Sequence, residues 1–155
     1  MGLPVTEAEK EASATLKPLA KYSALIVDDD PDVVLAIKMV MESEMSDFAI
    51  YTAGDGVAAV EMWQQKQPKV IILDMMLPKR SGFLVLDRVR SNANKGKGAP
   101  VIIMITGNLG MRHQRYAESL GVNYYLTKPF KMERLMGIIR AELEKQEKID
   151  NGQSV

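Results

Sequence analysis

The chain has 155 residues, 46% of them hydrophobic, and its 20 basic and 20 acidic side chains give a formal net charge of zero. This length suits one domain, and the balanced charge excludes a general attraction to nucleic acid or membrane surfaces. The absence of cysteine excludes disulfides and thiolate metal sites. No apolar run reaches the roughly 18 residues of a membrane span, and no signal peptide is evident. We therefore expect a cytoplasmic protein without membrane insertion.

The first part of the chain predicts an arm, a strand and a helix. Residues 1–20 are polar and alanine-rich, which favours a flexible or partly helical arm. The apolar run 24–27 predicts a strand. Pro31 suits the first turn of a helix, and Ile37 and Met41 follow it at helical spacing.

Four more pairs of a strand and a helix are predicted along the chain. The remaining strands are apolar runs at residues 48–52, 70–73, 101–105 and 123–126. The remaining helices are marked by apolar residues at helical spacing: Ala59, Val60 and Trp63; Val85, Leu86 and Val89; Ala117 and Leu120; Leu135, Ile138, Ile139 and Leu143. This alternation predicts an α/β fold with a parallel sheet between two helical layers. We expect the domain to span residues 21–147, followed by a disordered tail, 148–155.

Polar residues stand where the predicted strands end. Asp28–Asp30 follow the first strand, Asp74 the third, Thr106 the fourth, and Lys128 comes after the fifth. Ligands bind at the carboxyl ends of parallel strands, so these side chains are expected to form one site. Neighbouring carboxylates repel each other, which indicates that a positive charge belongs among the aspartates.

Four motifs carry a resemblance to a known family: VDDD at residues 27–30, DMMLPKRSG at 74–82, Thr106-Gly107, and YLTKPF at 125–130. In this order the sequence resembles the receiver domain of two-component response regulators, similar to the single-domain chemotaxis regulator, over about residues 24–145. The resemblance implies a flavodoxin-like (βα)5 three-layer sandwich with the strand order 2-1-3-4-5.

The resemblance also implies how the acidic residues act. Asp74 matches the phosphoacceptor, Asp28 and Asp29 match the metal-binding pair, and Met76 matches the position whose backbone carbonyl completes the metal site. The implied cofactor is Mg²⁺ (or Mn²⁺), a hard cation that prefers oxygen ligands. Asp30 is expected either to be solvated or to cap the helix that opens at Pro31.

Other matched residues are expected to contact the phosphoryl group or to shape the site. Lys128 and the Thr106 hydroxyl match groups that bind phosphoryl oxygens, and the bond from Lys128 to Pro129 is cis in the family. Pro78 and Gly82 match the loop after the acceptor, where a turn and a flexible backbone are expected.

Tyr125 matches an aromatic switch residue that moves between exposed and buried rotamers as Thr106 moves. An alternative interpretation needs no switch, because a tyrosine with a packed ring and a solvated hydroxyl is common. In the switch interpretation, a downstream protein reads the face formed by the fourth helix, the fifth strand and the fifth helix.

The implied function is that of a stand-alone, phosphorylation-dependent response regulator. Its phosphodonor is expected to be a histidine kinase or a phosphotransfer protein. The chain itself is expected to catalyse at most its own phosphorylation and dephosphorylation. About ten residues follow the last predicted helix, too few for a DNA-binding domain, so no direct nucleic acid binding is expected. A monomer and a phosphorylation-linked dimer are both compatible with the resemblance.

Three alternatives remain open. The chain could be the amino-terminal receiver of a longer regulator, or a pseudo-receiver that serves only as a protein-binding module. A phosphohydrolase of the haloacid dehalogenase-like family is disfavoured, because it would require a second aspartate where Met76 stands.

Overall fold

The computed structural model describes residues 20–92, 99–107 and 110–152. Its strands are β1 (Tyr22–Val27), β2 (Phe48–Ala53), β3 (Val70–Asp74), β4 (Val101–Thr106) and β5 (Tyr124–Thr127). Its helices are α2 (Pro31–Glu44), α3 (Gly56–Lys66), α4 (Gly82–Asn92), α5 (Gly110–Ser119) and α6 (Met132–Asp150). Each predicted strand and helix is present, with ends displaced by a few residues.

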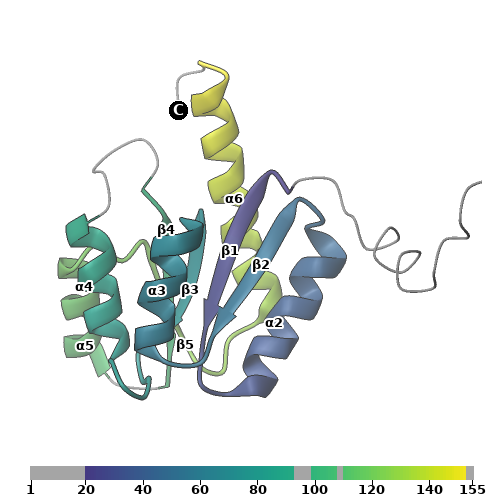
Figure 1. Ribbon diagram of the computed structural model, residues 1–155. Helices are drawn as coiled ribbons and strands as arrows, with labels where there is room; N and C mark the ends of the chain where they lie inside the picture. The colour runs from purple at the N-terminus through teal and green to yellow at the C-terminus, as the bar shows by residue number, and fades with distance from the viewer. Residues whose placement is uncertain (1–19, 93–98, 108–109, 153–155) are drawn as a thin grey trace, which may run out of the picture.

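The strands form one parallel sheet in the order β2-β1-β3-β4-β5 (Figure 1). Helices α3, α4 and α5 pack on one face of this sheet, and α2 and α6 pack on the other. The predicted flavodoxin-like three-layer fold is therefore confirmed. Because all strands run in the same direction, their carboxyl ends meet at a single edge, the lower edge in Figure 1.

The central strand β3 is buried along its whole length, as its continuous apolar run predicts. Successive side chains of a strand point to opposite faces, so Ile71 and Leu73 join the core beneath α3 and α4. Val70 and Ile72 join the core beneath α2 and α6. Two cores thus hold the ends of β1 and β3 in fixed positions.

Aspartates fix the starts of two helices near this edge. Asp30 caps α2, because its Oδ1 accepts a hydrogen bond from the Asp32 N–H at 2.9 Å. The capping alternative for Asp30 is therefore confirmed, with Pro31 in the first turn as predicted. Asp55 caps α3 by accepting from the Ala58 N–H at 2.8 Å.

The last helix is longer than predicted. It continues to Asp150, so residues 148–150, expected in the tail, are helical. Lys69 donates to Gln146 at 2.6 Å and the Tyr22 hydroxyl donates to Glu147 at 3.1 Å, just before the extension. Within it, Asp150 accepts from the Gln146 side chain at 2.9 Å. Most of the predicted arm, residues 1–19, and residues 153–155 lie outside the described residues.

No helix in the described ranges combines the length and the apolar character needed to cross a membrane.

Candidate functional site

The fold brings the strand-end residues into contact. Asp28 directly follows β1, Asp74 ends β3, and Lys128 follows β5. The Lys128 ammonium lies 2.8 Å from Asp28 Oδ2 and 3.1 Å from Asp74 Oδ2, so one lysine bridges two carboxylates. Its positive charge offsets part of the repulsion between these two carboxylates.

Three carboxylates form an oxygen-rich group at this edge. Asp28, Asp29 and Asp74 each offer an oxygen, and these atoms all lie within 4.8 Å of one another. Asp28 and Asp74 are only 5% and 6% exposed, whereas Asp29 is open to solvent. A buried pair with one accessible member fits a hard divalent cation that keeps part of its water shell.

Backbone hydrogen bonds orient the two buried carboxylates. Asp28 Oδ1 accepts from the Asp30 N–H at 2.9 Å, and Asp74 Oδ1 accepts from the Met76 N–H at 3.0 Å. In each residue the other oxygen faces Lys128. The Met76 side chain is 64% exposed, and the predicted role of its carbonyl oxygen stays a prediction.

Burial and charge shift the pKa values of this group. The pKa of Asp74 is raised, mainly because burial removes water from the carboxylate and also because Asp28 repels its charge. Burial alone would lower the pKa of Lys128, but its hydrogen bonds to Asp28 and Asp74 outweigh that effect and raise it. Lys128 therefore stays protonated at neutral pH.

The raised pKa of Asp74 predicts a pH-dependent change in stability. The folded protein holds the Asp74 proton more tightly than the unfolded chain, so stability is lost as pH rises from the unfolded value of 3.8 through the folded pKa. Asp74→Asn removes this cost and is therefore expected to raise the free energy of unfolding at pH 7. Urea denaturation at pH 7 and pH 4 measures the difference, which should shrink at pH 4.

The pKa of Asp55 is shifted in the opposite direction, so Asp55 serves as a comparison in the same measurement. Its pKa is lowered, chiefly by the hydrogen bond from the Ala58 N–H, so its ionised form stabilises the fold above the unfolded pKa. Asp55→Asn should therefore not stabilise the protein at pH 7. Equal stabilisation by Asp74→Asn at both pH values would contradict the assignment to ionisation.

Thr106 presents a buried hydroxyl without a partner. The side chain is fully buried at the end of β4, and its Oγ1 has no hydrogen-bond partner among the described residues. The Thr106 carbonyl accepts from the Lys128 N–H at 2.6 Å, which links this residue to the lysine. An unpaired buried hydroxyl is costly, so a group that accepts a hydrogen bond from it would relieve that cost.

Tyr125 also buries its hydroxyl. Its Oη is buried without a hydrogen-bond partner in the part of the chain that the structure describes, and burial raises its pKa. The ring packs against the core beneath α3 and α4. The alternative with a solvated hydroxyl is therefore wrong for this conformation, while movement between rotamers stays a prediction.

The loop after Asp74 is closely packed against its surroundings. A Cβ at Gly82 would lie 2.3 Å from the Asp74 carbonyl oxygen, so this position requires glycine for space. Its φ is not in the left-handed region, so the backbone conformation itself does not require glycine. The bond between Lys128 and Pro129 is cis, as the resemblance implies.

Sequence reasoning missed contacts between this loop and the start of α3, which involve Lys79, Asp55 and Gly56. Lys79 lies in the loop and adopts a left-handed φ of 65°, and its ammonium lies 3.5 Å from Asp55 Oδ2. Gly56 donates its N–H to the Pro78 carbonyl at 3.2 Å. A lysine with positive φ leaves no sequence signal, since this region favours glycine and asparagine.

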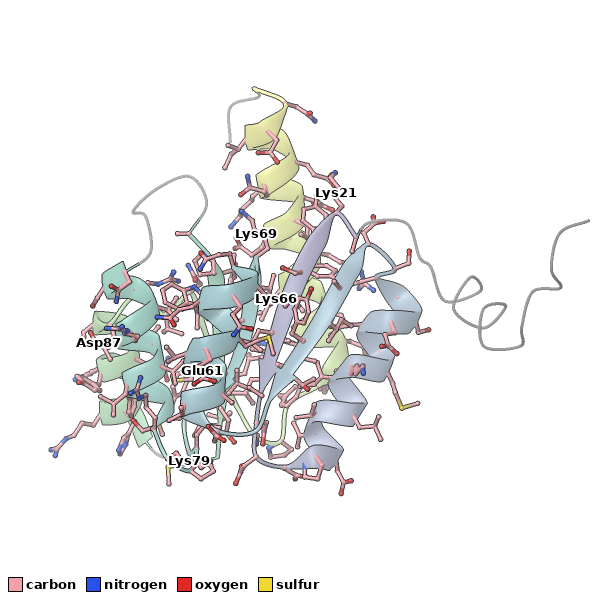
Figure 2. The ribbon with its side chains drawn as sticks, in the orientation of Figure 1. Lys21, Glu61, Lys66, Lys69, Lys79 and Asp87 are labelled. Carbon is pink, nitrogen blue, oxygen red and sulfur yellow. The ribbon has the colours of Figure 1, made fainter. Side chains whose placement is uncertain are left out.

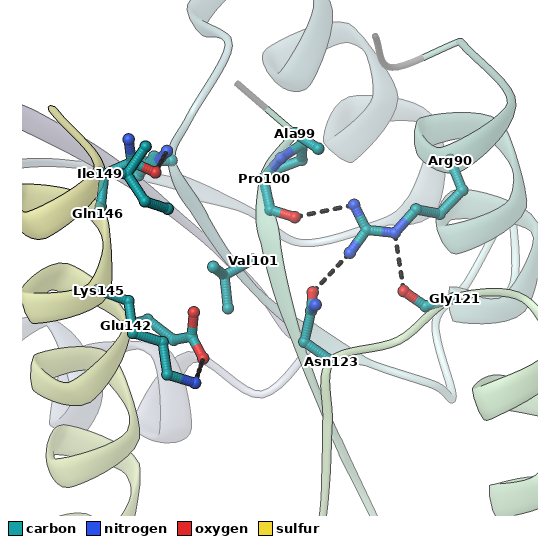
Figure 3. A pocket seen from close by; sticks show the side chains of 11 residues that line it. Arg90, Ala99, Pro100, Val101, Gly121, Asn123, Glu142, Lys145, Gln146 and Ile149 are labelled. Atoms are coloured by element: carbon teal, nitrogen blue, oxygen red, sulfur yellow. Dashed lines mark hydrogen bonds and ion pairs between the residues drawn. The ribbon is translucent and has the colours of Figure 1, made fainter. Parts of the chain in front are cut away.

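A hollow of about 430 Å³ lies at the opposite edge of the sheet, where the strands begin (Figure 3). Arg90 donates there to the backbone carbonyls of Pro100 and Gly121, both at 2.8 Å, and to the side chain of Asn123. These contacts tie α4 to the starts of β4 and β5. The hollow is therefore separate from the aspartate site.

The comparisons with known proteins agree with this geometry. Residues 24–140 match the response regulator receiver domain family. The DNA-binding dual master transcriptional regulator RpaA of Synechocystis is 32% identical over 125 residues, which cover 81% of this chain and 50% of RpaA. The DNA-binding response regulator MtrA of Mycolicibacterium smegmatis is 32% identical over 123 residues, covering 79% of this chain and 51% of MtrA.

A solved structure shows the same fold. A CheY-like response regulator receiver domain protein from Methanospirillum hungatei has a TM-score of 0.73 at 23% identity, covering 82% of this chain and 97% of its own. The chain spans about half the length of the curated relatives it matches. With the matched region covering most of the described fold, the chain belongs to the response regulator receiver domain family.

Proposed function

We propose that this chain is a phosphorylation-controlled signalling module that accepts a phosphoryl group on Asp74. The observation that carries this proposal is the single contact group in which Lys128 bridges the buried carboxylates of Asp28 and Asp74. The phosphodonor is a histidine kinase or a phosphotransfer protein, the donor class that receiver domains use. In this role the chain is a phosphoacceptor and assists only its own phosphorylation and dephosphorylation.

Asp74 acts as the nucleophile in this proposal. One of its carboxylate oxygens forms a bond to phosphorus while the bond between phosphorus and the donor breaks, and the donor leaves with that electron pair. The Met76 N–H holds Asp74 Oδ1, so the carboxylate keeps one orientation. Lys128 then pairs with a phosphoryl oxygen, because its ammonium already lies 3.1 Å from Asp74 Oδ2.

The carboxylates of Asp28, Asp29 and Asp74, with the Met76 carbonyl, would hold Mg²⁺ (or Mn²⁺). The three carboxylates offer oxygens within 4.8 Å of one another, and hard cations prefer such ligands. When bound, the ion offsets negative charge on the phosphoryl oxygens.

The phosphoryl group would then change the conformation of the output face. It adds about 1.5 to 2 negative charges and three acceptor oxygens, and the unpaired Thr106 hydroxyl is a ready donor to one of them. Movement of Thr106 toward the phosphoryl group would change the packing beside Tyr125, whose hydroxyl is already buried. A downstream protein would read the result on α5, β5 and α6, with the chain as a monomer or a phosphorylation-linked dimer.

Intact-mass spectrometry after incubation with MgCl₂ and acetyl phosphate tests this function. The expected result is a gain of one phosphoryl group in the wild type, absent with EDTA and absent in Asp74→Asn. A gain in Asp74→Asn as large as in the wild type would assign the acceptor elsewhere. No gain together with no Mg²⁺ binding would favour a constitutive protein-binding module.

A second candidate differs only in what reads the signal. The relatives RpaA and MtrA are named as DNA-binding regulators, and each is about twice as long as the matched region. In this alternative a DNA-binding part of the same polypeptide reads the face of α5, β5 and α6. Immunodetection of the native polypeptide separates the two, because this chain alone has a mass of 17.2 kDa.

A further inference from the structure

The loop between β3 and α4, residues 75–81, is anchored on the side of the acceptor. The Met76 N–H donates to Asp74 Oδ1 at 3.0 Å, and the Gly82 N–H donates to the Met75 carbonyl at 2.8 Å. Within the loop, the Arg80 N–H donates to the Pro78 carbonyl at 2.7 Å, which closes a tight turn. The position of Met76 therefore depends on the position of the whole loop.

The start of α3 anchors the same loop from the other side. The Gly56 N–H donates to the Pro78 carbonyl at 3.2 Å. Asp55 uses Oδ1 to cap α3, and its Oδ2 lies 3.5 Å from the Lys79 ammonium. Figure 2 shows Lys79 at the lower end of α3, on the edge of the sheet where the aspartates lie.

Gly56 lies directly against the backbone of the loop at Arg80. A Cβ at this position would lie 2.1 Å from the Arg80 carbonyl oxygen and 2.7 Å from the Arg80 carbonyl carbon. These are backbone atoms, so no rotamer change can make room and the loop itself would have to move. A Cβ at Gly54, two residues earlier, would have no other atom within 4 Å. Neither glycine has a left-handed φ, so alanine is acceptable to the backbone at both positions.

We propose that Gly56 is a positioning residue of the acceptor site, which sets the place of the loop that follows Asp74 and thereby the fit of the site to a divalent cation. The inference rests on the proposed function, since Met76 is the proposed carbonyl ligand. A side chain at residue 56 moves the Arg80 backbone, and the tight turn at Pro78 transmits that movement toward Met76. Small displacements of ligands are costly because catalytic and metal-binding geometry is narrow.

The test compares Gly56→Ala with Gly54→Ala in the full 155-residue chain. Gly56→Ala is expected to weaken Mg²⁺ binding and to slow phosphoryl gain from acetyl phosphate, each by about tenfold. Gly54→Ala should match the wild type in both. Amide hydrogen exchange should accelerate at Met76 and Gly82 in Gly56→Ala, with the strands β1 and β3 unchanged.

Three outcomes would overturn the proposal. Gly56→Ala could match Gly54→Ala, or it could accelerate exchange equally in the loop and the strands, which would show a general loss of stability. If Gly56→Ala does not fold, Lys79→Met replaces it. Removing that positive charge alone would strengthen Mg²⁺ binding, so weaker binding supports the anchor, and unchanged or stronger binding overturns it.

The exchange measurement also separates this inference from the proposed function. A wild type that neither binds Mg²⁺ nor gains mass would end the proposed function. Faster exchange confined to Met76 and Gly82 in Gly56→Ala would still support the positioning of the loop by α3.

Discussion

Lys128→Met is expected to slow phosphoryl transfer to Asp74 by about 100-fold, the cost typical of removing one charged donor from a reacting oxygen. The same substitution is expected to strengthen Mg²⁺ binding by about tenfold, or about 1.4 kcal/mol. Both effects follow from one contact, because the Lys128 ammonium lies against the two carboxylates that would bind the cation. Methionine keeps most of the aliphatic stem and removes only the charge.

Two measurements on one variant test this pair of effects. Isothermal titration with MgCl₂ gives the affinity, and intact mass followed over time with acetyl phosphate gives the transfer rate. Lys145→Met is the matched control, since Lys145 also pairs with a carboxylate, Glu142 at 3.3 Å, but lines the hollow at the opposite edge. The control should match the wild type in both measurements.

The change in Mg²⁺ affinity in Lys128→Met separates two interpretations of this residue, because they predict changes of opposite sign. If Lys128 mainly shapes the site, its loss would weaken Mg²⁺ binding and transfer together. If it mainly supplies charge, binding strengthens while transfer falls. A parallel loss of both would therefore contradict the electrostatic role that the two short contacts indicate.

The fold and the contact group were predictable because they depend on patterns that repeat along the chain. Alternating apolar and amphipathic segments determine a parallel sheet, and a parallel sheet collects its carboxyl ends at one edge. Asp28, Asp74 and Lys128 stand directly at these ends, so their contact follows from strand order. The order itself came from resemblance, because alternation alone does not distinguish which strands are neighbours.

What the sequence did not predict depends on single backbone contacts. The approach of Gly56 to Arg80 joins residues that are 24 positions apart, and no periodicity marks such a contact. The sequence likewise does not indicate the left-handed φ of Lys79, because lysine has no preference for that region. The contacts of Lys69 and Tyr22 with the end of α6 also join residues far apart in the sequence, and no periodicity marks them.

Gly82→Ala is expected to lower the free energy of unfolding by about 3 kcal/mol, the upper range for forcing extra volume into a packed site. The added Cβ would lie 2.3 Å from the Asp74 carbonyl oxygen and 2.6 Å from Met75 Cα, both backbone atoms. The first turn of α4 would therefore have to separate from the end of β3. Urea denaturation followed by the fluorescence of Trp63, the chain's one tryptophan and a buried residue, measures the change.

Gly137→Ala supplies the control for this substitution. Gly137 lies inside α6 and is exposed, and a Cβ added there would have no neighbouring atom within 4 Å. Alanine there should stabilise the protein by about 0.5–1 kcal/mol, because it is the better helix former. The two substitutions add the same methyl group, so opposite signs isolate the close approach at Gly82. If Gly82→Ala were as stable as the wild type, β3 and α4 could separate at no cost, and lack of space would not explain why glycine follows the acceptor loop.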